Sequence, residues 1–296
     1  MENSISVLIP VYNRRQPLLK AIDSVLRQTI LPGEIIVIDD CSPFNIKDYL
    51  FAAGYLQNNT IKVLRNEVNI GPAGSRNNGL AHARGELIAF LDSDDSWHEH
   101  KLEKQLFLLT SNPELDFVYC GSTWISNDGK IKPSEHTLYK DNLWDKLVVG
   151  WWTPHISSTG LMKKTALQKL NGFDPNLWHG EDIDLWMRLA QQNMKVDYCP
   201  ECLSYFYFDS NERLTKHKDK LKRANAFLNK WANYFIQQGD KKTAVIFRNN
   251  TLTKFAIESF VDSYRDGDLL VGVKMYFRYL WNKKEFYSLI WNKLSK

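Results

Sequence analysis

The 296-residue sequence predicts an α/β fold in which helices flank a mostly parallel sheet. The first observation is an alternation, because short β-rich runs and longer amphipathic segments follow one another through residues 4–120. The second is the placement of acids, because aspartates come directly after apolar runs, where open sheets of this kind bind ligands. With 44% hydrophobic and 24% charged residues, the chain has enough material for one large or two small domains.

The expected elements follow in a regular order. The apolar runs predict five strands, at residues 4–11, 34–40, 61–65, 86–92 and 116–120. The segments between them have the length and spacing of helices, at residues 16–28, 45–56, 72–83 and 98–110. This order favours a parallel sheet with helices on both faces.

The rest of the chain is less regular. From about 121 to 212 the pattern breaks and tryptophans gather, so we expect this part to cover the strand ends. Beyond Leu214 the sequence becomes helical, basic and aromatic. We therefore expect one domain over 1–212, in two halves at about 1–120 and 121–212, followed by a helical region over 213–296.

The stretch LIAFLDSDDSW at residues 87–97 runs from apolar residues into Asp92, Asp94 and Asp95. Clustered like charges repel one another and are costly to desolvate, so the cluster favours a bound cation. Mg²⁺ and Mn²⁺ are held by one or two carboxylates and keep positions open for phosphate oxygens. The cluster therefore indicates a phosphate-bearing substrate, although aspartates after a strand, such as those in DDCSPF, also cap helices.

Two common phosphate-binding loops are absent from the sequence. No stretch fits G-x-x-x-x-G-K-[ST], and the first strand leads into PVYNRRQ instead of a glycine fingerprint. The spacing of Gly71, Gly74 and Gly79 does not restore that fingerprint. These absences argue against P-loop hydrolysis and hydride transfer, and a net charge of +4 is too small to indicate a nucleic-acid partner.

The cysteines and the hydropathy pattern predict a cytoplasmic location. Four cysteines in a chain of this length do not make a disulfide framework, and the amino terminus lacks the layout of a signal peptide. No apolar run approaches the ~20 residues that span a bilayer. The C-P-E-C motif at 199–202 has no second ligand pair, so we expect a buried structural pair of cysteines.

Five motifs occur in a specific order over residues 5–190. They are PVYN after the first strand, DD after the second, GPAGSRNNGL before a helix, LDSDD after the fourth strand, and GEDIDLW. This set resembles glycosyltransferase family 2, whose members are inverting, nucleotide-sugar-dependent enzymes of the GT-A fold. The resemblance implies a GT-A catalytic domain over 1–212, with its nucleotide-sugar half at about 1–120 and its acceptor half at about 121–212, and does not cover the last hundred residues.

The resemblance implies a role for each acid of the nucleotide half. Asp94 is the expected direct ligand of Mn²⁺ or Mg²⁺, Asp92 a ligand of the metal or the ribose, and Asp95 an auxiliary carboxylate. Asp39 is expected to accept a hydrogen bond from a uracil ring, as an acceptor-only group would. The full expected nucleotide-binding set is Pro10, Val11, Tyr12, Asn13, Asp39, Arg76, Asp92 and Ser93.

The family's catalytic base is a carboxylate in an E-D pair, here Glu181 and Asp182. We expect Asp182 to deprotonate the acceptor hydroxyl, so that in-line attack inverts the anomeric configuration. First-turn acids also favour the helix dipole, which is the structural alternative. Trp178 and His179 are expected acceptor contacts. Family members often supply a histidine as a further metal ligand, for which Asp209, His217 or water is the candidate here.

The resemblance implies transfer of a sugar, most simply from a UDP-sugar, to a saccharide or lipid-linked acceptor in bacterial surface polysaccharide synthesis. One alternative is a sugar-phosphate nucleotidyltransferase, which would need a glycine-rich loop after the first strand. Another is a non-catalytic saccharide-binding module, which would be expected to lose the acids.

The carboxy-terminal segment has its own pattern. Apolar and aromatic residues recur at helical spacing, with basic residues beside them, at Leu269, Val273, Lys274, Tyr276, Phe277, Arg278, Leu280, Lys283 and Lys284. This pattern predicts either a helix packed on the catalytic domain or a helix that rests on anionic lipid. The second would give a peripheral contact with the inner face of the membrane.

Overall fold

A computed structural model describes residues 5–57, 59–126, 129–134, 143–149, 156–208 and 217–265. The chain forms two compact units. The first consists of Met1–Trp144 and Thr153–Phe208, and the second of Asp145–Trp152 and Asp209–Lys296. All the predicted site residues fall in the first unit, apart from the two candidates for a further metal ligand.

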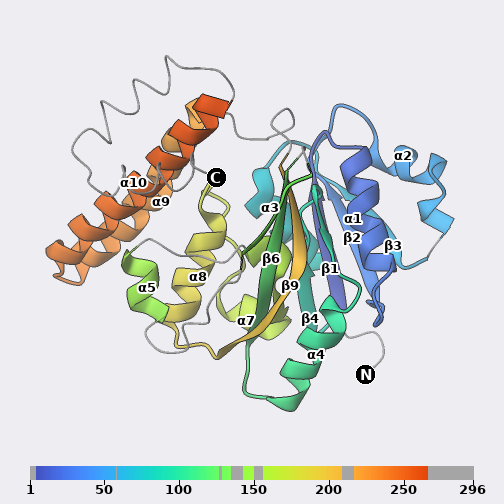
Figure 1. Cartoon of the computed structure of the whole chain (residues 1–296), viewed down its shortest axis with the longest axis horizontal. Helices are drawn as coiled ribbons and strands as arrows, with labels where there is room; N and C mark the ends of the chain where they lie inside the picture. Colours follow the sequence, from blue (N-terminus) through green and yellow to red (C-terminus); the bar gives the residue numbers. More distant parts are fainter. Residues whose placement is uncertain are drawn as a thin grey trace. The chain divides into compact units, whose positions relative to one another are not determined.

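The first unit is built on a sheet whose initial strands are parallel, as predicted (Figure 1). Its order begins β3 (Ile61–Arg65), β2 (Glu34–Asp39), β1 (Ile5–Val11) and β4 (Leu87–Phe90). These strands are rich in β-branched residues, and β1 and β2 are buried along almost their whole length. In the register of the sheet, Val11 pairs with Asp39, and Asp39 pairs with Arg65, so the carboxyl ends of three strands lie level.

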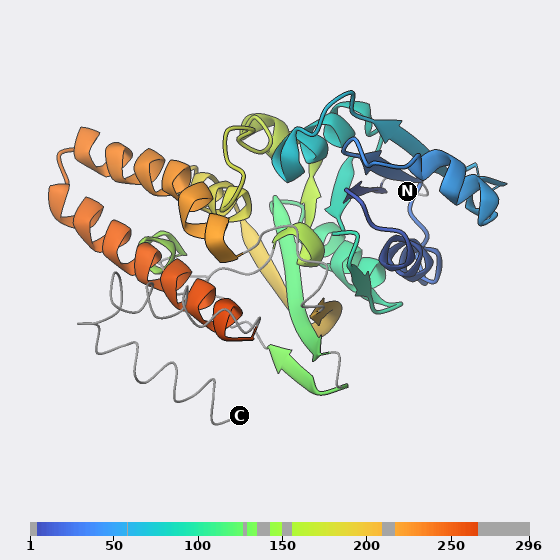
Figure 2. The same ribbon diagram turned by 90° about the horizontal axis from the view of Figure 1, so that it is seen from above.

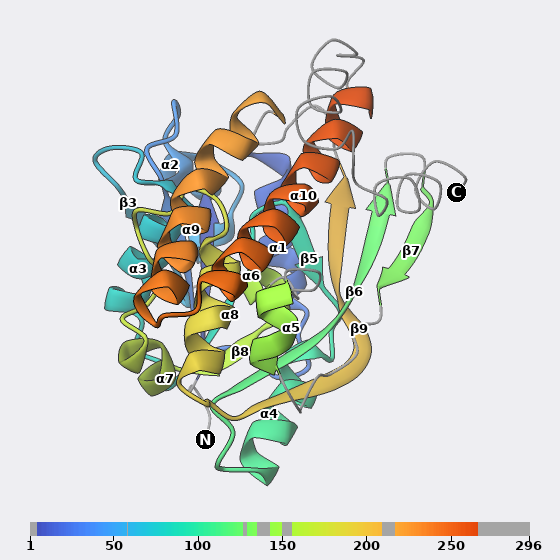
Figure 3. The ribbon, with the colours of Figure 1, turned by 90° about the vertical axis from the view of Figure 1, so that its left-hand side faces the viewer.

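The sheet continues with strands of mixed direction. The order after β4 is β8 (Leu161–Lys163), β6 (Phe117–Ser126), β9 (Val196–Phe208) and β5 (Asp95–Trp97), while β7 (Ile131–Ser134) pairs with β6. The strand predicted at 116–120 is longer in the structure because β9 pairs with β6 along its length, apart from an irregularity around Gly121 (Figure 3). Sequence reasoning missed this extension because the register depends on a distant partner strand.

Helices cover both faces of the parallel strands. The buried apolar residues of α1 (Gln16–Leu26), α2 (Ile46–Ala52) and α4 (Lys101–Ser111) form one core with β1, β2 and β4. Helix α3 (Gly71–His82) lies on the opposite side of β1 from α1 (Figure 2). It approaches the sheet closely, because a Cβ at Gly79 would lie 2.8 Å from Ile38 Cδ1.

The predicted helices have the right positions but differ at their ends. The helix expected over 45–56 stops at Ala52, because Gly54 has a φ of +83° and a short 3₁₀ turn follows at Tyr55–Gln57. The helix expected from 98 begins at Lys101, since 95–97 are taken by the short strand β5. Both differences come from the local backbone conformation at the helix ends, which the spacing of apolar side chains does not predict.

The later part of the first unit carries α6 (Ile156–Thr159), α7 (Lys164–Lys169) and α8 (Glu181–Gln191). The loop between α7 and α8 is fixed to α3 by one side chain. Asn77 Nδ2 donates to the carbonyl of Phe173 at 2.7 Å, and the Phe173 N–H donates to Asn77 Oδ1 at 2.8 Å. The Phe173 ring packs edge-on against Phe90 of β4, with ring centroids 5.1 Å apart. These contacts fix the point at which α8 begins.

The described part of the second unit consists mainly of a helical hairpin. Helices α9 (His217–Gln237) and α10 (Lys241–Arg265) lie antiparallel and pack through aromatic residues, with 5.6–5.8 Å between the ring centroids of Phe247 and those of Phe227 and Phe235 (Figure 2). Helix α5 (Leu143–Val149) precedes them in the chain. Among the described residues, no helix is long and apolar enough to cross a membrane. The basic-aromatic pattern at 269–284 lies outside the described residues, and so does Asp209.

The tie between α3 and the α7–α8 loop makes a prediction about Gly172. Its φ is +65°, and an added Cβ would lie 2.4 Å from Asn77 Oδ1. Gly129 also has a positive φ, +78°, but a Cβ there would meet nothing within 4 Å. Both alanine substitutions bear the left-handed backbone cost of about 1 kcal/mol, and Gly172→Ala adds an overpacking cost of about 1–3 kcal/mol. Denaturant unfolding measures the difference, and equal losses in the two variants would contradict the tie.

Candidate functional site

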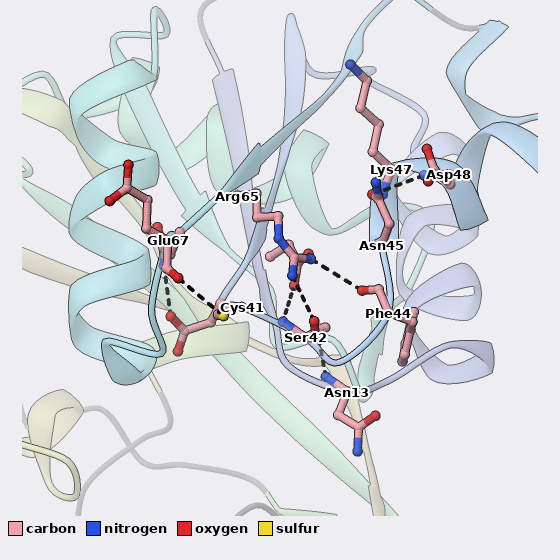
Figure 4. Close-up of polar contacts among 12 residues, drawn as sticks. Asn13, Cys41, Ser42, Phe44, Asn45, Lys47, Asp48, Arg65 and Glu67 are labelled. Carbon is pink, nitrogen blue, oxygen red and sulfur yellow. Dashed lines mark hydrogen bonds and ion pairs between the residues drawn. The ribbon is translucent and has the colours of Figure 1, made fainter.

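The first strand ends in a turn that is linked to the turn after β2. Pro10 and Val11 are the last residues of β1, and Asn13 follows with a left-handed φ of +54°. This conformation is unusual for a residue other than glycine, and asparagine tolerates it best. The Asn13 N–H donates to Ser42 Oγ at 2.9 Å (Figure 4). The predicted PVYN segment therefore lies beside the residues that follow Asp39.

Asp39 is buried at the end of β2, where both of its carboxylate oxygens are engaged. Oδ1 accepts from the Ser42 N–H at 2.9 Å, and Oδ2 accepts from Arg65 at the end of β3. The Asp39 side chain is 1% exposed, whereas that of Arg65 is 43% exposed. Asp39 is thus held between the turn that follows β2 and the end of β3.

The neighbouring Asp40 has a different task, because it caps α3. Its carboxylate accepts the N–H groups of Ile70 and Gly71, each at 2.9 Å, and Asn66 Nδ2 at 2.8 Å. Backbone N–H groups at a helix start lack partners within the helix, so a carboxylate there is stabilising. Of the two acids of DDCSPF, Asp39 thus binds the turn after β2 and the end of β3, whereas Asp40 binds the start of α3.

The three aspartates after β4 have separate partners. Asp92 accepts from Arg76 Nη2 at 2.7 Å, and Asp94 forms an ion pair with Arg14 at 2.5 Å. Asp95 accepts from the Ser158 hydroxyl at 2.6 Å, and Ser158 Oγ in turn accepts from the Asp92 N–H at 3.1 Å. Ser93 is buried between them. The cluster is therefore held by Arg76, Arg14 and Ser158, and Ser157 also forms a hydrogen bond with Asp92.

The electrostatics of this cluster are those of crowded carboxylates. Burial raises the pKa of Asp92, but the charge and hydrogen bond of Arg76 outweigh it, so that pKa lies below its ordinary value. Burial raises the pKa of Asp94, and the negative charge of Asp92 adds to this effect against the opposing charge of Arg14. Burial, together with the negative charges of Asp94 and Asp92, raises the pKa of Asp95 well above its usual range.

Arg76 joins the aspartate cluster to the start of α8. Its Nη1 donates to Glu181 Oε1 at 2.9 Å while Nη2 donates to Asp92. Burial alone lowers the pKa of the Arg76 guanidinium, but the charges of Asp92 and Glu181 outweigh burial and raise it above its ordinary value. The guanidinium also lies over the Phe173 ring, 5.3 Å from its centroid. A single buried cation therefore sets the relative positions of the two acidic motifs.

Asp182 and the two residues predicted to contact an acceptor lie at the entry to α8. Asp182 is half-buried, and its Oδ1 accepts the Ile183 N–H at 2.8 Å. Trp178 remains 42% exposed, and its ring lies against Gly71, where an added Cβ would come within 3.4 Å. His179 is half-buried beside it. These side chains thus lie between the start of α3 and the start of α8.

The donor set fits a hard divalent cation that shares its coordination with a substrate phosphate. Asp94 keeps a side chain that is 38% exposed, and Asp92 keeps one that is 30% exposed. Two carboxylates with open positions are what Mg²⁺ and Mn²⁺ require. The described residues contain no cluster of three or more His, Cys, Asp or Glu side chains that would hold a metal alone. In the C-P-E-C motif, Cys199 is buried and Cys202 is half-buried, and neither forms a disulfide.

Sequence reasoning missed several residues that organise the site. Arg14 follows β1, and Arg65 is the last residue of β3. A basic residue at the end of a strand that is parallel to the one ending in Asp39 was a usable signal for Arg65. Ser158 and Asn77 gave no signal, because their partners lie 63 and 96 residues away in the chain. Arg76 was predicted near the nucleotide, and its partnership with Glu181 spans 105 residues.

The Arg76 bridge predicts a specific stability cost. Replacing Arg76 with Met leaves Asp92 and Glu181 without their shared cation, and breaking a buried pair costs about 3 kcal/mol or more. Arg84, 73% exposed and 3.3 Å from Glu34, is the matched control. Arg84→Met costs less than about 1 kcal/mol, as exposed pairs do. Denaturant unfolding compares the variants, and a loss in Arg76→Met no larger than in Arg84→Met would contradict the bridge.

Comparison with known proteins identifies relatives over more than half of the chain. The family model described as Glycosyl transferase family 2 matches residues 6–170. The Escherichia coli protein named UDP-Glc:alpha-D-GlcNAc-diphosphoundecaprenol beta-1,3-glucosyltransferase WfgD is 33% identical over 192 residues, which are 64% of this chain and 70% of that protein. An uncharacterized glycosyltransferase of Rickettsia conorii is 36% identical over 195 residues, or 65% of this chain, but the chain spans only 31% of its length.

Solved structures share the fold at lower sequence identity. Staphylococcus aureus TarS residues 1–349, in complex with UDP-GlcNAc, has a TM-score of 0.62 and 18% identity, covering 87% of this chain and 81% of that one. The Pyrobaculum calidifontis mannosyltransferase PcManGT, in complex with GDP-Man and Mn²⁺, has a TM-score of 0.61 and 15% identity, covering 98% and 83%. The expected GT-A fold is thereby confirmed, and the chain belongs to glycosyl transferase family 2.

Proposed function

We propose that this glycosyltransferase moves a sugar from a UDP-sugar to a hydroxyl group of a saccharide or lipid-linked acceptor, with inversion at the anomeric carbon. The observation that supports it most is the Arg76 bridge, which brings the aspartates after β4 next to the acids that open α8. An acidic cluster that can hold a metal ion for the diphosphate, next to a second carboxylate pair that can accept a proton, suits attack of a hydroxyl on a sugar attached to a diphosphate.

The nucleotide end of the donor belongs at the carboxyl ends of β1, β2 and β4. The PVYN turn and the residues after Asp39 are linked there by the Asn13–Ser42 hydrogen bond. A UDP donor is supported by the solved neighbour TarS, which is described in complex with UDP-GlcNAc. The sugar would then lie towards α8, within reach of the acids at its first turn.

A divalent metal would be held by Asp94, with Asp92 as its second carboxylate, and when bound it supplies charge neutralisation for the leaving diphosphate. Two solved neighbours, GalNAc-T7 and PcManGT, are described with Mn²⁺. Within the chain, Arg76 keeps Asp92 ionised, because its charge lowers the pKa of that carboxyl group. Arg14 neutralises part of the charge at Asp94.

Asp182 is the proposed base, and Glu181 its positioning partner. Glu181 gives a carboxylate oxygen to Arg76, which fixes the first turn of α8 relative to Asp92. Asp182 follows it directly and takes the proton from the acceptor hydroxyl as the new glycosidic bond forms. Trp178 lies in the loop just before α8, where its ring is partly exposed, and it would contact the acceptor sugar.

The acceptor is proposed to be a growing saccharide of the bacterial surface, on a lipid carrier. Three relatives point to this class, since WfgD is named for a diphosphoundecaprenol acceptor, and TuaG and WcaA for teichuronic acid and colanic acid biosynthesis. Peripheral contact with the membrane through the carboxy-terminal segment would bring the enzyme to such an acceptor. The nucleotidyltransferase alternative finds no support among these relatives.

The metal assignment predicts the behaviour of Asp94→Ala. Losing the main carboxylate ligand should abolish sugar transfer and weaken UDP binding in Mn²⁺, because the diphosphate then loses its counter-ion. Asp48→Ala, which changes an exposed acid in the first turn of α2, should leave both unchanged. Calorimetric titration of UDP, with and without Mn²⁺, measures the effect. Full transfer by the wild-type protein in excess chelator would rule the metal out.

The base assignment predicts a separation of binding from turnover. Asp182→Asn preserves the size and the Ile183 contact of the side chain, so UDP affinity should stay within about twofold of wild type. Turnover should fall by about 10²-fold or more, because proton removal contributes that much. Steady-state rates and UDP titration on the same preparation separate the two. Undiminished turnover would move the role of base to another residue.

A further inference from the structure

Two serines of the short helix α6 contact the aspartates that follow β4. Ser157 forms a hydrogen bond with Asp92. Ser158 Oγ accepts the Asp92 N–H at 3.1 Å, and the same hydroxyl donates to Asp95 Oδ2 at 2.6 Å. Both serines are buried. The acids on either side of Asp94 are therefore held by a helix of only four residues.

The backbone at the end of α6 is in turn bound by side chains from β5, α4 and β9. Three consecutive carbonyl groups, those of Ser158, Thr159 and Gly160, accept from these side chains. The donors are Trp97 Nε1 and Ser204 Oγ to Ser158 at 2.7 and 2.6 Å, Gln105 Nε2 to Thr159 at 2.7 Å, and Lys101 Nζ to Gly160 at 3.4 Å. All four donor side chains are buried. We call Trp97, Lys101, Gln105 and Ser204 the α6 cradle.

Lys101 is the unexpected member of the α6 cradle, because its side chain is 0% exposed. A lysine is almost never fully buried unless an acid pairs with it. Among the residues that the structure describes, no carboxylate pairs with this ammonium group, and burial lowers its pKa to about 8. An apolar side chain would avoid this cost of desolvation, so stability alone does not explain a lysine at this position.

The contacts of Lys101 organise the rest of the cradle. Its Nζ donates to Gln105 Oε1 at 2.8 Å and lies 4.1 Å from the centroid of the Trp97 ring. Because an ammonium group donates and cannot accept, Gln105 must turn its amide oxygen to Lys101 and its Nε2 to the carbonyl of Thr159. Lys101 therefore orients a neighbouring donor to α6, in addition to its own bond with the Gly160 carbonyl.

We propose that the α6 cradle, with Lys101 at its centre, positions the proposed metal ligands through the two serines of α6. The contacts run from the cradle to the end of α6, and from its serines to Asp92 and Asp95, which flank Asp94. Partners behind metal ligands fix the orientation of those ligands, and losing one typically lowers metal affinity by about 10–100-fold. The inference rests on the proposed metal at Asp94 and names the residues that set its affinity.

The test titrates Mn²⁺ against UDP binding in wild type, Lys101→Met and Lys164→Met. Lys164 is a matched control, because it is half-buried and also donates to a backbone carbonyl, that of Ala83 at 2.6 Å. The Mn²⁺ concentration that half-saturates UDP binding should rise by about tenfold or more in Lys101→Met, and should not change in Lys164→Met. UDP affinity without metal should match wild type in both, which a general loss of structure would not allow. An unchanged Mn²⁺ requirement in Lys101→Met, or an equal rise in Lys164→Met, would overturn the inference.

A second pair of variants carries the test if Lys101→Met does not fold. Ser204→Ala removes one hydroxyl of the cradle, and Ser24→Ala removes a hydroxyl of α1 that also donates to a backbone carbonyl, at 2.7 Å. The two serines are 0% and 1% exposed. Ser204→Ala should raise the half-saturating Mn²⁺ concentration several-fold, and Ser24→Ala should leave it at the wild-type value. The same value in both variants would contradict a role for the cradle.

The wild-type titration separates this inference from the proposed function. If Mn²⁺ strengthens UDP binding in wild type but the cradle variants behave like their controls, only the role of the cradle fails. If Mn²⁺ does not affect UDP binding in wild type, the proposed metal fails, and the inference fails with it.

Discussion

The site depends on one buried guanidinium that two distant carboxylates share. Arg76 is fixed on α3 and donates to Asp92 after β4 and to Glu181 at the start of α8. Without a cation at this point, two acids would be buried close together with no opposite charge, at a cost of several kcal/mol. Arginine suits the position because its planar group stays charged and offers separate donors to two acceptors. The arrangement of both acidic motifs therefore follows from where α3 holds Arg76.

Helix α3 is itself held by polar contacts at its start and by close packing along its length. Asp40 caps its first N–H groups, and Gly79 allows it to approach Ile38 of the sheet. Asn77, the residue after Arg76, then binds the backbone of Phe173 in both directions. The sheet thus positions the helix, and the helix positions the loop before α8. The first turn of α8 is then joined to the aspartates after β4 through Glu181 and Arg76.

Much of the fold was predictable from the sequence because the parallel half of the sheet is built from local patterns. Buried strands gave apolar runs, and amphipathic helices gave their spacing, so β1 to β4 and α1 to α4 were found within a few residues. The strands β5, β7, β8 and β9 were not predicted as such. They are short or irregular, or depend on partners far away in the chain, and periodicity within a segment carries no information about them.

The acids of the site were predictable for a similar reason, since charges at strand ends are unusual enough to stand out. What could not be predicted is how these acids are paired. The structure gives Asp40 to a helix cap, Asp94 to Arg14 and Asp39 to Arg65, and each pairing depends on the sheet register or on a turn. The pairing of Asp39 with Arg65 joins the ends of β2 and β3, which no pattern within either strand indicates.

A crystal structure with UDP and Mn²⁺, in which an anomalous difference map locates the metal, tests the central claim most directly. The account predicts a metal peak at Asp94, roughly 2 Å from a carboxylate oxygen and next to the diphosphate, with Arg76 still bonded to both Asp92 and Glu181. A metal peak away from Asp94, or an Arg76 side chain turned from Glu181 to the diphosphate, would contradict it.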